Sequence, residues 1–261
     1  MSTMRPKASK ISGLRAAAPS FLAAAAVLAA LMAALFLSSC SARMEASVRN
    51  DLSARIALRM EVPALLDGRV RQISNIPQGA PLFDAARLRT EFQGRKSISL
   101  QELSVPSPDS MIATLYVPNL ELLSNDRTVA PEGLLTLRSL PASGGSPASW
   151  ELSIRIDRQN AAAAFNLFPG VDKTLLASLS PPALDKDPLT AAEYRMNLEQ
   201  VIIGRKAMPT FDQCGIDIAF TAPRPIQAAT GGTFEGQQFK GRIGLFDLLT
   251  LEKPVTLSIR W

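Results

Sequence analysis

The sequence predicts an α+β fold, a mostly antiparallel β-sheet with several inserted helices, preceded by an N-terminal signal or anchor helix. Short stretches of alternating apolar and polar residues recur from residue 44 to the C-terminus, which is the period of half-buried strands. Stretches with helical spacing interrupt them. Residues 21–37 are apolar without a break, which indicates a segment made for a membrane.

The N-terminal segment has the character of an export signal. Residues 1–39 contain four basic residues and no acidic residue, and the apolar run from Phe21 to Leu37 is 17 residues long. A membrane-spanning helix needs about 20 apolar residues. The length therefore leaves two alternatives open, a cleaved signal peptide and an uncleaved anchor.

A local motif favours the cleaved signal. Leu37, Ser38 and Ser39 precede Cys40, and this tetrapeptide resembles the lipobox of bacterial lipoproteins. The resemblance implies cleavage before Cys40, a diacylglycerol thioether on its sulfur, and usually a fatty acid such as palmitate on the new amine. Two or three acyl chains hold a protein on a membrane stably, whereas one chain is marginal.

The predicted organisation follows from this site. Residues 1–39 are the signal peptide and residues 40–261 form an extracytoplasmic α+β domain, with a further division near 141–149 left open. The domain would be lipid-anchored to the cell membrane or the outer membrane of a bacterial envelope. Because Ser41 stands where an aspartate favours inner-membrane retention, the resemblance favours the outer membrane.

The charge of the cleaved chain excludes one class of partner. The full sequence has 28 basic and 23 acidic residues, but four basic residues leave with the signal peptide. The remaining 24 and 23 nearly balance, so we expect no nucleic-acid binding.

The stretch after the cysteine predicts a β-hairpin. Apolar and polar residues alternate over 44–48 and again over 52–62, and Asn50 and Asp51 between them suit a two-residue turn. The tether between lipid and first strand would then be very short.

The remaining elements follow in order. Helices are predicted over 63–75, 82–94, 158–167 and 190–204, the last with a capping box from Thr190 and Glu193, while 173–179 could be helix or strand. Strands are predicted over 97–105, 111–117, 134–140, 149–156, 216–220 and 255–261. Trp261 is expected to pack as a core or edge aromatic residue.

Few residues are suited to catalysis. The sequence has no histidine, which removes Ser-His-Asp triads and most catalytic metal sites. Cys214 opens an alternating strand and is expected to be a small buried residue. Gly231 and Gly236 lack the lysine of a phosphate-binding loop and are expected in turns, and Asp185 is expected in a solvated loop. No catalytic residue, cofactor or metal ligand is therefore predicted.

One family resemblance is present. The stretch CSARMEASVRNDLSARIALRMEV, with DPLTAAEYRMNLEQVIIG and FDLLTLEKPVTLSIRW further on, resembles the LppM-like group of bacterial lipoproteins of unknown function. The resemblance implies an α+β fold and a lipid-contacting, non-enzymatic envelope role. The chain departs from that group because it ends in a strand without a trailing transmembrane helix, so no functional residue is carried over.

Two functional hypotheses follow. The favoured one is a lipid-anchored binding or scaffolding module that uses a sheet face, or a groove beside the helix at Thr190, to bind lipid or another envelope protein. The alternative is a membrane-tethered hydrolase that uses paired carboxylates, the general acid-base pair available without histidine.

Overall fold

The protein is described here by a computed structural model, which describes residues 41–130, 133–142, 148–167 and 173–261. The predicted signal peptide, its motif Leu37, Ser38 and Ser39, and the predicted lipidation site Cys40 lie outside the described residues. Among the described residues, no helix has the length and apolarity that crossing a bilayer requires. The described residues belong to one compact unit.

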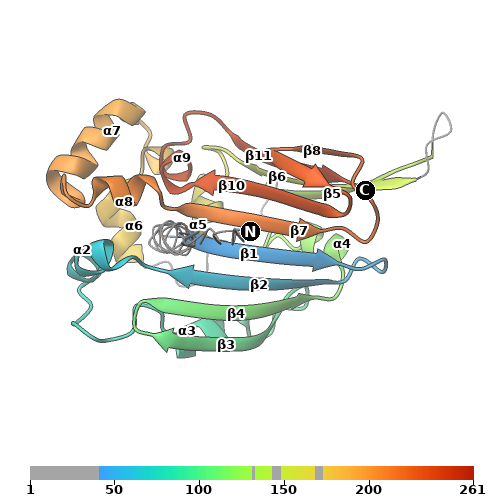
Figure 1. Ribbon diagram of the computed structural model, residues 1–261, viewed down its shortest axis with the longest axis horizontal. Coiled ribbons are helices and arrows are strands. Elements are labelled where there is room, and N and C mark those ends of the chain that lie inside the picture. Colours follow the sequence, from blue (N-terminus) through green and yellow to red (C-terminus); the bar gives the residue numbers. More distant parts are fainter. Residues whose placement is uncertain (1–40, 131–132, 143–147, 168–172) are drawn as a thin grey trace, which may run out of the picture. The chain divides into compact units, whose positions relative to one another are not determined.

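Two sheets form the framework, as Figure 1 shows. The large sheet has the strand order β3-β4-β2-β1-β7-β10-β9, with bounds β1 (Ser41–Val48), β2 (Ala54–Glu61), β3 (Ser99–Ser107), β4 (Ser110–Val117), β7 (Gly215–Thr221), β9 (Gly232–Glu235) and β10 (Gln238–Gly244). The small sheet has the order β5-β6-β11-β8, with bounds β5 (Leu135–Leu140), β6 (Ser149–Ile156), β8 (Ala228–Thr230) and β11 (Val255–Arg260).

Helices are inserted between the strands throughout. They are α2 (Ala64–Ser74), α3 (Ala85–Phe92), α4 (Leu120–Asn125), α5 (Ala161–Leu167), α6 (Lys173–Leu179), α7 (Ala191–Asn197), α8 (Met208–Asp212) and α9 (Leu245–Thr250), with a 3₁₀ turn η2 (Pro182–Leu184) and a π-helical segment η3 (Leu198–Ile202). The predicted α+β class with mostly antiparallel strands is confirmed.

The predicted hairpin forms with a longer turn than expected. Met44 pairs with Leu58 and Ala46 with Ile56. The turn spans residues 49–53 because Leu52 adopts a left-handed conformation (φ 63°) and its N–H donates to the Arg49 carbonyl at 3.0 Å. Asp51 accepts bonds from the Ser53 amide and hydroxyl, which lower the pKa of its carboxyl.

One pairing departs from the antiparallel pattern. β1 lies parallel to β7, with Ser41 opposite Gly215 and Ala42 opposite Ile216. The two strands therefore begin at the same end of the large sheet, where α2, α6, α7 and α8 also lie (Figure 1). We call this end the helical end.

The two sheets share one main core. Trp261 is 1% exposed, and its ring lies 5.6 Å from the ring of Phe220 in β7. Its backbone continues the β11–β6 pairing, since the Trp261 and Trp150 amides each donate to the other's carbonyl. Trp261 is thus a core aromatic residue, in agreement with the sequence. A smaller cluster of Phe83, Leu88 and Met111 packs separately.

Three further details differ from the sequence-based expectations. Residues 228–244, for which the sequence analysis predicted only the turns at Gly231 and Gly236, also form the strands β8, β9 and β10, and residues 245–250 form α9. The predicted helix at Thr190 keeps its capping box but continues as the π-helical segment η3. The helical spacing of Tyr194, Leu198 and Val201 in the sequence predicts that Val201 lies on the packed face, but the change of pitch turns it outward to 73% exposure.

Candidate functional site: an apolar cavity at the helical end

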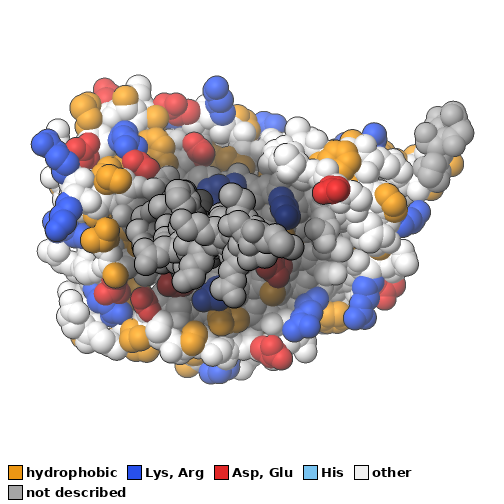
Figure 2. All heavy atoms as spheres, viewed as in Figure 1, with side chains coloured by type: hydrophobic (Ala, Val, Ile, Leu, Met, Phe, Trp, Pro, Cys, Tyr) orange, Lys and Arg blue, Asp and Glu red, His pale blue; other side chains and the backbone are white. Residues whose placement is uncertain are grey.

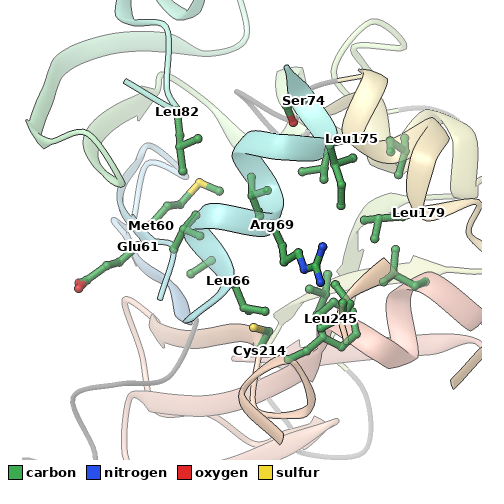
Figure 3. A pocket seen from close by; sticks show the side chains of 18 of the residues that line it. Met60, Glu61, Leu66, Arg69, Ser74, Leu82, Leu175, Leu179, Cys214 and Leu245 are labelled. Carbon is green, nitrogen blue, oxygen red and sulfur yellow. The ribbon is translucent and has the colours of Figure 1, made fainter. Parts of the chain in front are cut away.

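An apolar cavity of about 260 Å³ lies at the helical end. Helices α2, α6, α8 and α9, the end of β2 and the first residues of β1 and β7 supply its wall. Figure 3 shows the side chains of α2 and α6 pointing toward one another across it. The apolar side chains from the three main helices are Leu66, Val70, Ile73, Leu175, Leu176, Leu179, Leu245, Leu248 and Leu249.

The amphipathic character of α2 explains its place in the wall. Leu66, Val70 and Ile73 recur at helical spacing and line the cavity, whereas Leu65 on another side of the helix is 57% exposed. Asn75 ends the helix in a left-handed conformation (φ 58°), and its N–H donates to the Arg71 carbonyl. The chain then turns back along the helix, so Ile76, Leu82 and Phe83 also line the cavity.

Arg71 holds this returning segment in place. Its side chain is 5% exposed, and its Nε donates to both carboxylate oxygens of Asp67 at 2.8 and 2.9 Å. Its Nη1 donates to the carbonyls of Pro77 and Ala80 at 3.0 and 2.5 Å. A buried arginine left without such partners would cost several kcal/mol, so these bonds fix one wall of the cavity. This role could not be predicted from the sequence, because a charged residue in an amphipathic helix usually faces solvent.

Arg69 is the cation at the cavity. Figure 3 shows its guanidinium extending from α2 toward the cavity, while the carboxylate of Glu61 points away. Its Nη1 donates to Gln72 Oε1 at 3.1 Å, and among the described residues no carboxylate lies within 4.0 Å of it. Its Nη2 also lies beside Gly204, which has a φ of +87° and ends the segment after η3. The guanidinium can therefore pair with an anionic group of a ligand.

Tyr194 supports the opposite wall. It is fully buried, its hydroxyl donates to the Leu179 carbonyl at 2.9 Å, and its ring stacks on Phe246 at 6.0 Å. Burial raises the pKa of this phenol well above its usual range, because the charged form would lose its hydration. The bond joins α7 to the end of α6, next to the cavity.

Cys214 also lines the cavity, and it is a buried packing residue as expected. It is 1% exposed, and its Sγ donates to the Thr210 carbonyl at 3.5 Å. Cys214 lies between the end of α8 and the start of β7, next to the part of the cavity wall that α8 and α9 form.

A second hollow, of about 540 Å³, lies on the face of the large sheet. Its wall mixes charged side chains of β1, β2 and β10, such as Arg43, Arg55 and Lys240, with apolar ones such as Ala46 and Phe220. Arg43 and Glu45 form an exposed ion pair at 2.8 Å. The sequence analysis suggested a sheet face or a groove beside the helix at Thr190 as the contact surface, without specifying the face. The apolar cavity has no lining residue from α7 among the described residues, and α7 contacts its wall through the bond from Tyr194 to Leu179.

The described residues place no carboxylate pair of the hydrolase hypothesis in either hollow. Among them, Glu61 is the one acid lining the apolar cavity, and Glu45 is the one acid lining the second hollow. Across the described ranges, no three His, Cys, Asp or Glu side chains gather as a metal site would require.

The remaining candidates lie where the sequence placed them. Gly231 (φ 78°) and Gly236 (φ 56°) form the turns before and after β9. Asp185 is exposed in the loop before α7 and accepts a bond from the Asp187 amide at 3.2 Å.

Comparisons with known proteins identify no family. No protein-family model and no curated protein sequence matches the chain. A search of solved structures finds similarity to the NMR structure of the folded domain of the Mycobacterium tuberculosis LppM protein, at 10% identity over 85% of this chain and 90% of that chain, with a TM-score of 0.36.

Proposed function

We propose that the chain is a membrane-anchored, extracytoplasmic lipoprotein with a non-enzymatic role, and that it binds one hydrocarbon chain of a lipid in the apolar cavity. The observation that carries this proposal is the cavity itself, whose wall is apolar apart from a few groups such as Arg69. The anchor is supported by the motif at Cys40.

The size of the cavity sets the size of the ligand. An apolar cavity of about 150 Å³ engineered in another protein holds benzene, with six carbons. A cavity of about 260 Å³ should therefore hold roughly ten carbons. This matches a large part of one acyl chain and excludes three chains together.

An estimate of the binding free energy explains why lipid binding in the cavity depends on the anchor. Burying about ten methylene groups gains roughly 8 kcal/mol at ~0.8 kcal/mol each, and association costs at least about 4 kcal/mol. The remaining ~4 kcal/mol corresponds to a Kd near 1 mM for a free ligand. A protein held on a bilayer meets lipid at a high effective concentration, so such a modest affinity is sufficient there.

Native mass spectrometry of the full-length protein, solubilised from membranes, tests the proposal. The wild-type protein should carry one non-covalent lipid adduct. Val70→Trp should reduce the adduct at least several-fold, because the larger ring fills the cavity from α2. Leu65→Trp is the matched control on the same helix and should keep the adduct, since that side chain is exposed.

A second measurement separates loss of lipid binding from loss of the fold. Circular dichroism should show the same thermal transition for both variants, which excludes unfolding as the cause of a lost adduct. Equal adducts in both variants, or none in the wild-type protein, would refute lipid binding in the cavity.

A further inference from the structure

We infer that the helical end is the surface that docks on the membrane, with α2 and residues 198–206 resting on a bilayer that contains anionic phospholipid. This inference rests on the lipid anchor of the proposed function and adds an orientation to it. It follows from three observations, which concern the start of β1, the exposed apolar side chains and the charges.

The start of β1 brings the anchor to this end. β1 begins at Ser41, and Ala42 lines the apolar cavity. Two peptide units separate Ala42 from Cys40, so their Cα atoms are at most about 7.6 Å apart. A lipid on Cys40 therefore holds the bilayer close to the helical end and far from the turn at the other end of β1.

Large apolar side chains are exposed on the same segments. Val201 in η3 is 73% exposed and Leu65 in α2 is 57% exposed. Leu65 and Arg69 are four residues apart and share one side of α2, and Arg69 lies beside Gly204, three residues after Val201. Two exposed apolar side chains thus stand on adjoining segments, and Figure 2 shows apolar, basic and acidic side chains mixed at this end.

The charges of these segments favour an anionic surface. Residues 64–74 and 195–212 contain five Arg and Lys residues against three acids. Glu199 pairs with Arg205 at 3.1 Å, Asp212 pairs with Arg195, and Asp67 pairs with Arg71. Arg69 and Lys206 have no carboxylate within 4.0 Å among the described residues. Each such cation is attracted to an anionic leaflet.

The contacts are too weak to bind a membrane alone, but they need only orient an anchored protein. Two cations are attracted to the anionic leaflet, and partial burial of Val201 and Leu65 adds to this attraction. A preference of ~3 kcal/mol already corresponds to more than a hundredfold excess of one orientation. In that orientation the apolar cavity lies at the bilayer surface.

Photo-crosslinking of the full-length lipidated protein tests the orientation. A benzoylphenylalanine replaces Val201, or in the matched control Leu122, which is 58% exposed on α4. The Leu120 amide at the start of α4 donates to the Leu52 carbonyl in the β1–β2 turn, so the control lies at the opposite end. In vesicles of phosphatidylcholine and phosphatidylglycerol, the Val201 probe should yield at least five times more lipid adduct than the Leu122 probe.

A charge variant tests the electrostatic part. Lys206→Glu should lower the adduct at the Val201 probe several-fold, whereas Lys240→Glu on β10 should leave it unchanged. Equal lipid adducts at the two probes, or a Val201 adduct with a second copy of the protein in place of lipid, would overturn the orientation.

Flotation of the wild-type protein with the vesicles is measured first, because it separates a failure of the anchor from a failure of the orientation. If the wild-type protein does not float with the vesicles, the anchor and this orientation both fall. If it floats and the Leu122 probe reacts as well as the Val201 probe, only the orientation falls, and the lipid adduct seen by native mass spectrometry is unaffected.

Discussion

At the scale of single residues, the wall of the cavity depends on two buried polar side chains. Arg71 joins α2 to the segment that returns along it, and Tyr194 joins α7 to α6. Each makes its bonds to backbone carbonyls, so each fixes chain segments rather than side chains. The sequence alone could not show either role, because both depend on partners that the turns and the tertiary fold bring together.

Tyr194 should make the protein sensitive to alkaline pH. Its pKa is raised in the folded state, so the folded protein keeps the proton while the unfolded chain loses it above pH ~10. Stability contributed by the neutral phenol is full below pH ~10 and declines above it by up to about 1.4 kcal/mol per pH unit. Urea unfolding of the wild-type protein between pH 8 and 11 should show this decline.

The variant Tyr194→Phe isolates the effect. It should be less stable at pH 8 by about 1 kcal/mol, because the Leu179 carbonyl loses its donor, but it should decline less above pH 10. Tyr116→Phe is the control, since Tyr116 is 38% exposed and Tyr194 stays intact. An unchanged alkaline slope in Tyr194→Phe would contradict the prediction.

At the scale of elements, the sequence predicted those with a clear period and a buried face. The β1–β2 hairpin alternates over both strands, and its inward residues pair as Ala46 with Ile56. The capping box of α7 is also visible in the sequence. Both patterns depend on residues that are close together in the sequence, so the elements that they predict are found in the folded protein.

The elements that the sequence missed have no such period. All four residues of β9 are exposed, so no apolar alternation marks this edge strand, and the glycines around it resemble those of ordinary turns. The π-helical pitch of η3 likewise has no sequence pattern. The cavity was missed because its wall comes from residues spread between Ala42 and Leu249, which only the fold assembles.

Gly231 should be the critical residue of the β8–β9 turn. It has a φ of 78°, and a Cβ there would lie 2.5 Å from the Thr256 carbonyl oxygen. Gly231→Ala should therefore lower the free energy of unfolding by about 2 kcal/mol or more. Gly236→Ala is the matched control, since a Cβ at Gly236 meets open space and costs only the backbone strain of φ 56°. Equal losses in urea unfolding would show that the close contact is unimportant.

At the scale of the whole molecule, the proposed function divides between an anchor and a cavity. The sequence predicts the anchor from four residues, and the cavity follows from the tertiary structure. The helical end joins the two, because β1 begins there and Ala42 lines the cavity. The strands β5 and β6, on either side of the division considered near 141–149, pair within one sheet.

Cys40→Ala tests the anchor directly. The variant should lack lipid by intact mass and should move from the membrane to the soluble fraction, because no acyl chain remains. Its far-ultraviolet circular dichroism should match that of the wild-type protein, since Cys40 precedes β1. Ser41→Ala is the control and should stay with the membrane. A Cys40→Ala protein that matures and partitions as before would show that attachment depends on another feature.

The parallel pairing of β1 with β7 has a consequence for biogenesis. Ser41 and Gly215 are neighbours in space but lie about 170 positions apart along the chain. One side of the first strand therefore remains open until most of the polypeptide has been synthesised, and an open strand edge recruits other chains into aggregates. Acylation at an early stage would keep each nascent molecule spread out on a surface during this interval, which is a protective effect that precedes any binding activity.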